Sequence, residues 1–91
     1  MTSTWKIEFS TDIAKRLRKI DAASAERIIN YLETRVAKAE DPKSLGIAMK
    51  GKEFEWLWRY RVGDYRVICE LQHNRLVVLV IEIGHRREVY R

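Results

Sequence analysis

The part of the chain most informative about its structure is residues 56–71, which read Trp56-Leu-Trp-Arg-Tyr-Arg-Val-Gly-Asp-Tyr-Arg-Val-Ile-Cys-Glu-Leu71. On both sides of Gly63-Asp64, apolar or aromatic residues recur at every second position, which is typical of half-buried strands. Glycine at the first central position of a two-residue turn predicts a tight hairpin. Pairing outward from this turn joins only apolar or aromatic residues, namely Val62 with Tyr65, Tyr60 with Val67, Trp58 with Cys69 and Trp56 with Leu71. The sequence therefore predicts an antiparallel hairpin with these side chains on its buried face.

A further strand is predicted over residues 76–83, after a turn at His73-Asn74. This turn would pair Leu71 with Leu76, Cys69 with Val78 and Val67 with Val80. The new strand is apolar on both faces, as expected for a strand inside a sheet. We therefore expect an N-terminal strand, residues 5–9, to pair along its free side. Gly84 is predicted to end the strand.

Two helices are predicted between the first strand and residues 41–53, which are expected to form a loop containing Gly46 and Gly51. Ser10 or Thr11 offers an N-cap for the first helix. Helical spacing then gives two apolar stripes, Ile13, Leu17 and Ile20 in the first helix and Ile28, Ile29, Leu32 and Val36 in the second. The second helix should end before Pro42. The predicted fold class is α+β, in the order β-α-α-β-β-β, with a mainly antiparallel four-stranded sheet, two antiparallel helices packed on one face, and a single domain over residues 1–91.

Composition narrows the possible functions. The chain has 91 residues, 46% hydrophobic and 34% charged, and a net charge of +5, which excludes a disordered chain and suggests an acidic or polyanionic partner. One cysteine, Cys69, gives no disulfide framework, and with His73 and His85 it shows no metal-ligand spacing. The apolar run 76–81 is too short to span a bilayer, and no signal peptide is visible at the N-terminus. We expect a cytoplasmic protein with no metal, no cofactor and no membrane association.

The hairpin register gathers arginines on the face away from the helices. Arg61 lies opposite Arg66, and Arg59 is two residues along the strand. Like charges that face each other across two strands are destabilising, which favours a bound anion among them. The alternative is that the arginines extend into water and cover the apolar Ile68 and Leu79 with their stems.

The C-terminal segment adds to this cluster. Residues 84–91 read Gly84-His-Arg-Arg-Glu-Val-Tyr-Arg91, and folding them over the last strand would bring Arg86 and Tyr90 toward the three arginines. Guanidinium groups form bidentate bonds to phosphate oxygens, and an aromatic ring beside them can stack on a base. This pattern is typical of single-stranded nucleic-acid binding.

The element order, the segment 57–68 and the ending Gly84-His-Arg-Arg-Glu-Val-Tyr90 resemble the RelE/ParE superfamily of toxin–antitoxin toxins, most closely its RelE branch. The resemblance implies a metal-independent endoribonuclease that cuts mRNA in the ribosomal A site. In that reaction the ribose 2′-hydroxyl attacks the adjacent phosphate and leaves a 2′,3′-cyclic phosphate and a 5′-hydroxyl. It also implies a RelB-like antitoxin partner, and binding of operator DNA only through the antitoxin complex.

The same resemblance implies roles for individual residues. Arg66 would grip the scissile phosphate, Arg86 would stabilise the transition state, and Tyr90 would stack on the base or transfer a proton. Arg59 stands where the founding toxin has a lysine. Further RNA contacts are expected from residues of the loop, the hairpin and the tail, namely Lys50, Lys52, Arg61 and Arg87.

The general base is left open, because Leu57 stands where the founding toxin has another lysine. Arginine is a poor proton acceptor with a pKa above about 12. The candidates are His85, Tyr90 and Lys52, and His85 has the alternative of a purely structural hydrogen bond. Two other functions remain, a ParE-like poison of DNA gyrase with no catalytic activity and a basic RNA-binding module without toxicity.

Overall fold

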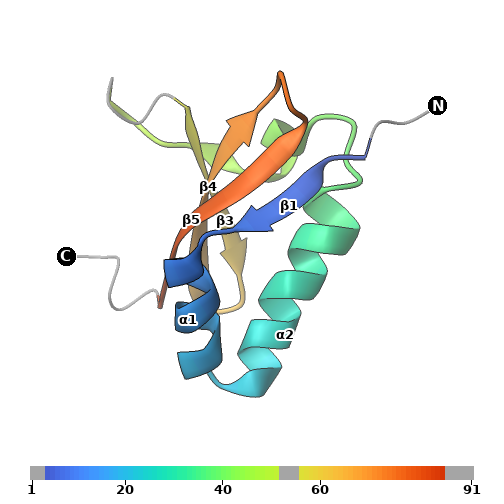
Figure 1. Cartoon of the computed structure of the whole chain (residues 1–91). Helices are drawn as coiled ribbons and strands as arrows, with labels where there is room; N and C mark the ends of the chain where they lie inside the picture. Colours follow the sequence, from blue (N-terminus) through green and yellow to red (C-terminus); the bar gives the residue numbers. More distant parts are fainter. Residues whose placement is uncertain (1–3, 52–55, 86–91) are drawn as a thin grey trace.

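The computed structural model describes residues 4–51 and 56–85, and these form two helices packed on one face of a five-stranded sheet (Figure 1). The elements are β1 (Lys6–Phe9), α1 (Thr11–Lys19), α2 (Ala22–Tyr31), η1 (Leu32–Val36), η2 (Pro42–Leu45), β2 (Ile47–Ala48), β3 (Leu57–Val62), β4 (Tyr65–Gln72) and β5 (Val77–His85). The strand order is β1-β5-β4-β3-β2, with β1 parallel to β5 and the other pairs antiparallel. The predicted α+β class and element order are confirmed. The difference is the short strand β2, together with the 3₁₀ turn η2, inside the segment predicted to be a loop.

The two helices form an antiparallel hairpin beside the sheet (Figure 1). Ser10 caps α1 by accepting a hydrogen bond from the backbone N–H of Ile13 at 3.2 Å. Asp21 caps α2 in the same way through Ser24 N–H at 3.0 Å, and this bond lowers the pKa of the Asp21 carboxyl. The π-helical turn η1 continues α2. Ile28, Leu32 and Val36 are fully buried along this combined helix, as the apolar stripe predicts.

The hairpin of β3 and β4 has the predicted register. Val62 pairs with Tyr65, Tyr60 with Val67 and Trp58 with Cys69. Gly63 has a φ of 59°, a conformation that favours glycine, so the turn is formed by the residue that predicted it. The outermost predicted pair is wrong, because β3 begins at Leu57 and Trp56 lies outside the ladder with 67% of its surface exposed.

The register of β4 against β5 is shifted from the predicted one, by two residues near the turn and by three beyond the bulge. Leu71 pairs with Val78 rather than Leu76, because the connection spans four residues, in which Leu76 adopts a φ of 52°. A bulge follows, since Ile68 pairs with Glu82 whereas Cys69 pairs with Val80. The extra residue, Ile81, inverts the alternation of side chains in the second half of β5. The strand also continues through Gly84 to His85 instead of ending at Gly84.

The main hydrophobic core lies between the sheet and the helices. It includes Tyr60, Val67 and Cys69, and burial raises the pKa of the Cys69 thiol, which keeps it protonated. We call the opposite surface of the sheet the far face; Ile68 and Val77 are buried there but lie outside the core cluster. Among the residues that the structure describes, no helix has the length and apolar character needed to cross a membrane.

Candidate nucleic-acid interface

A cleft of about 180 Å³ opens on the far face at the hairpin end of the sheet. Its lining consists of three cationic and two apolar side chains, namely Arg59, Arg61, Arg66, Leu45 and Ile47. We call it the arginine cleft. The three arginines that the sequence predicted to converge do line a single cavity.

Strand pairing sets the arginines beside one another. Arg61 lies directly opposite Arg66 across the β3–β4 ladder, and Arg59 follows on the same face of β3. Arg66 is only 5% exposed, Arg59 is half-buried and Arg61 is exposed, so positive charge is present from the floor of the cleft to its rim. Guanidinium groups keep their charge at any working pH. The cleft can therefore attract and orient an anion with several oxygen atoms, such as a phosphodiester.

The apolar wall of the cleft comes from residues 41–53, the segment predicted to be a loop. Asp41 accepts a hydrogen bond from Lys43 N–H at 3.1 Å and Pro42 starts η2, two features of a helical start that are visible in the sequence. The hydroxyl of Tyr60, buried in the core, donates to the carbonyl of Pro42 at 2.8 Å. Burial, more than any neighbouring charge, raises the pKa of Tyr60, so this hydroxyl stays protonated. Tyr60 thus fixes the segment that carries Leu45 and Ile47 against the sheet.

Replacing Tyr60 by phenylalanine tests this anchor. The change removes one hydroxyl and leaves the buried carbonyl of Pro42 without its donor, which should lower the free energy of unfolding by about 1–3 kcal/mol. Equilibrium unfolding in urea measures the loss. Tyr31→Phe removes a hydroxyl from a half-buried tyrosine of α2 and should change stability by less than about 0.5 kcal/mol. Equal effects of the two substitutions would argue against the anchoring role of Tyr60.

The other predicted site residues do not join the arginine cleft in the described structure. His85 pairs with Tyr65 and its ring meets that of Tyr65 edge to face, with centroids 5.3 Å apart. It lines a separate polar hollow at the hairpin turn, beside Tyr65 and Arg27 on the helix side. Lys50 is exposed beyond the end of β2 and is not part of the cleft lining. Lys52, Arg86, Arg87 and Tyr90 lie outside the described residues.

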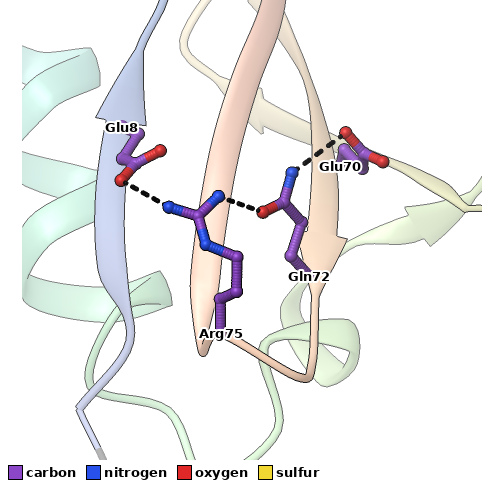
Figure 2. Close-up of polar contacts among 4 residues, drawn as sticks. All are labelled: Glu8, Glu70, Gln72 and Arg75. Carbon is purple, nitrogen blue, oxygen red and sulfur yellow. Dashed lines mark hydrogen bonds and ion pairs between the residues drawn. The ribbon is translucent and has the colours of Figure 1, made fainter.

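The opposite end of the strands carries a different arrangement of charge (Figure 2). Arg75 bridges two strands, with Nη2 lying 3.4 Å from a carboxylate oxygen of Glu8 and Nη1 donating to the side-chain oxygen of Gln72 at 2.7 Å. Gln72 in turn donates to Glu70 at 3.3 Å. Arg75 is therefore paired with an acidic group, Glu8, and Glu70 lies one hydrogen bond further on. The arginines of the cleft lie at the other end of the strands, away from Glu8 and Glu70.

A larger hollow, of about 640 Å³, lies between α1 and α2 and not on the far face. Its floor includes Leu17 and Ile29, and its rim mixes Arg18 with Glu26 and Glu33. This mixed charge does not favour a polyanion. The arginine cleft, although smaller, is therefore the stronger candidate for nucleic-acid binding.

Solved structures with a similar fold come from toxin–antitoxin systems. The toxin–antitoxin complex RelBE2 of Mycobacterium tuberculosis matches with a TM-score of 0.82 at 15% identity, over 94% of this chain and 95% of that one. A mutant of the Escherichia coli toxin RelE in the free state matches with a TM-score of 0.72 at 18% identity, over 94% and 87% of the two chains. The archaeal RelE–RelB complex of Pyrococcus horikoshii matches with a TM-score of 0.64 at 21% identity, over 91% of this chain and 96% of that one. A search of curated protein sequences finds no match.

The fold and the cleft define a small basic α+β protein with a cationic pocket on the far face of its sheet. Residues 7–90 match the family model described as the ParE toxin of the type II toxin–antitoxin system parDE. The chain belongs to this family, within the RelE/ParE superfamily, and is a toxin of a type II toxin–antitoxin system.

Proposed function

We propose that the protein is a ribosome-dependent endoribonuclease that cuts mRNA in the A site and so inhibits translation. The observation that carries the proposal is the arginine cleft, in which three guanidinium groups line one cavity on a sheet surface. Family membership supports a toxic activity, and the resemblance of segment 57–68 and of the ending 84–90 to the RelE branch favours an RNA target.

In the proposed reaction the ribose 2′-oxygen forms a bond to the adjacent phosphorus and the bond from phosphorus to the 5′-oxygen breaks. The products are a 2′,3′-cyclic phosphate and a free 5′-hydroxyl. Negative charge grows on the phosphoryl oxygens in the transition state, and Arg59 and Arg66 would stabilise it. Arg86 and Tyr90 keep their proposed roles in transition-state stabilisation and base stacking.

The described lining of the arginine cleft contains no side chain suited to proton transfer. The 2′-hydroxyl must lose a proton and the leaving 5′-oxygen must gain one. The cationic groups of the arginine cleft are all guanidiniums, which do not accept protons at neutral pH. His85 lines a different hollow, so we propose Lys52 or Tyr90 as the proton-transfer groups. A cleft of this kind fits a ribosome-dependent enzyme, because the ribosome can orient the RNA and supply geometry that the toxin lacks.

We also propose that the toxin is cytoplasmic and that a RelB-like antitoxin is its partner. Three of the structural neighbours are toxin–antitoxin complexes. The partner should carry acidic side chains where it meets the arginine cleft, because it has to neutralise the same guanidinium groups. Binding to operator DNA would belong to the toxin–antitoxin complex.

A second candidate function is poisoning of DNA gyrase by binding alone, without catalysis. The matching family model is that of the ParE toxin, and His85, the one histidine proposed as a base, faces away from the arginine cleft. Both observations favour a toxin without its own acid–base machinery.

Primer extension on a reporter mRNA in a purified translation system separates the two functions. We expect cuts within A-site codons when ribosomes are present and intact mRNA when they are absent. The purified toxin–antitoxin complex serves as the inactive control. Intact mRNA in both reactions, combined with DNA breaks in a gyrase assay, would replace the nuclease by the gyrase poison.

A further inference from the structure

A second cationic cleft, of about 380 Å³, lies next to the arginine cleft at the edge of the sheet. It is formed between α2, η1 and the hairpin end of β3, and its lining includes Arg27, Tyr31, Thr34, Arg35 and Arg61. We call it the α2 cleft. None of these residues has a role in the proposed cleavage except Arg61, which is expected to contact RNA.

Arg61 lines both cavities and so connects them around the edge of β3. The edge is open at this point, because β2 pairs only with Trp58 and Arg59 and no described strand covers β3 beyond them. The positive surface that begins at Arg66 therefore continues past Arg61 onto the helix side of the molecule.

The helix presents its charged and aromatic groups in a single row. Arg27, Tyr31 and Arg35 follow one another at intervals of four residues, which puts them on one side of α2 and η1. The two arginines lie about 12 Å apart along the helix axis, so they can contact different phosphates of one strand. Arg27 reaches the hairpin turn, where its Nη1 atom would lie 3.1 Å from a Cβ added to Gly63. The described residues include no ion pair that neutralises Arg27, Arg35 or Arg61.

We propose that the α2 cleft is a second RNA subsite, in which the strand that leaves the arginine cleft passes Arg61 and continues along α2. Arg27 and Arg35 bind its phosphates, and the half-buried ring of Tyr31 offers a face on which a base stacks. This inference rests on the proposed function, because it takes RNA to occupy the arginine cleft. An extended acidic peptide would meet the same charges, but the aromatic ring and the continuity through Arg61 favour a nucleic-acid strand.

The test measures binding of the full-length toxin to single-stranded RNA made uncleavable by 2′-O-methylation. Fluorescence anisotropy compares an oligonucleotide of about 12 nucleotides, long enough to follow both clefts, with one of about 3 nucleotides. The double variant Arg27→Gln/Arg35→Gln should bind the long RNA roughly tenfold more weakly and the short RNA as the wild type does. Its slope of log affinity against log salt should fall by about 1.4, because each lost phosphate contact removes about 0.7.

The matched control is Lys15→Gln/Lys19→Gln, which removes two charges from exposed positions of α1 and gives the same net charge. It should retain wild-type affinity for the long RNA. Equal losses in the two double variants, or no loss in either, would overturn the subsite. The subsite would also be overturned if the Arg27→Gln/Arg35→Gln variant bound RNA normally but bound the antitoxin weakly. That result would assign the α2 cleft to an acidic protein segment.

The cleavage assay distinguishes the failure of this inference from the failure of the proposed function. If the wild type cuts mRNA on the ribosome while the Arg27→Gln/Arg35→Gln variant binds the long RNA normally, only the subsite is wrong. If the wild type neither cuts mRNA nor binds either oligonucleotide, both proposals are wrong.

Discussion

Replacing Arg66 by lysine is expected to slow mRNA cleavage on the ribosome by about 100-fold or more, the cost of losing one transition-state hydrogen-bond donor. Lysine keeps the positive charge, but it is a point charge and cannot form the two parallel hydrogen bonds that a guanidinium makes to a phosphate. Arg66 is 5% exposed at the floor of the arginine cleft, so its geometry is held by the sheet around it. Single-turnover cleavage of a programmed ribosome measures the rate directly.

Arg75→Lys is the matched control, because it makes the same chemical change at the other end of the strands. Arg75 contacts Gln72 and Glu8, away from the cleft, and its substitution should leave cleavage unchanged (Figure 2). Arg66→Ala and Arg86→Ala should each abolish growth arrest while the unfolding transition is retained. Normal cleavage by Arg66→Lys together with growth arrest by both alanine variants would exclude the proposed arginine chemistry.

The hairpin of β3 and β4 was predictable because local chemistry and tertiary burial agree there. Gly63 is required by the turn, and the turn fixes which residues face each other. Arg61 and Arg66 are therefore neighbours by register alone. The cationic half of the candidate site follows from the sequence for this reason.

The register of the second half of β5 was not predictable from the sequence. A prediction from alternating side chains holds only when no extra residue is inserted into the strand. Ile81 forms a bulge, and its apolar side chain gives no local sign that the register changes there. Without the bulge, His85 would share the face of Leu79 and of the arginines. With it, His85 lies beside Tyr65 on the helix side and lines a different hollow from the one that the arginines line.

The apolar wall of the arginine cleft was not predictable for a different reason. Residues 41–53 lack a period of two or of 3.6, and only the capping pattern at Asp41 and Pro42 indicates a turn. What fixes the segment is the hydroxyl of Tyr60, which is separated from Pro42 by 18 residues. A contact over that distance depends on the finished sheet, and no local pattern predicts it.

Gly46→Ala is expected to destabilise the protein by about 1–3 kcal/mol and to weaken RNA binding in the arginine cleft. Gly46 has extended backbone angles that any residue adopts, so the cost comes from space alone. A Cβ at this position would lie 2.8 Å from the ring of Tyr60 and 3.1 Å from the backbone oxygen of Arg59. Tyr60 is buried and hydrogen-bonded to the carbonyl of Pro42, so its ring cannot move away easily. The strain therefore falls on the segment that carries Leu45 and Ile47. Urea unfolding and RNA anisotropy measure the two effects.

A double-mutant cycle with Tyr60→Leu isolates this clash. Leucine removes the ring that meets the new Cβ, so adding Gly46→Ala to Tyr60→Leu should cost at least about 1 kcal/mol less than adding it to the wild type. A rescue of this size identifies close packing of Gly46 on Tyr60 as the cause of the instability. Additive effects would instead assign the cost to the other close contact of the new Cβ, the backbone oxygen of Arg59, which Tyr60→Leu leaves in place.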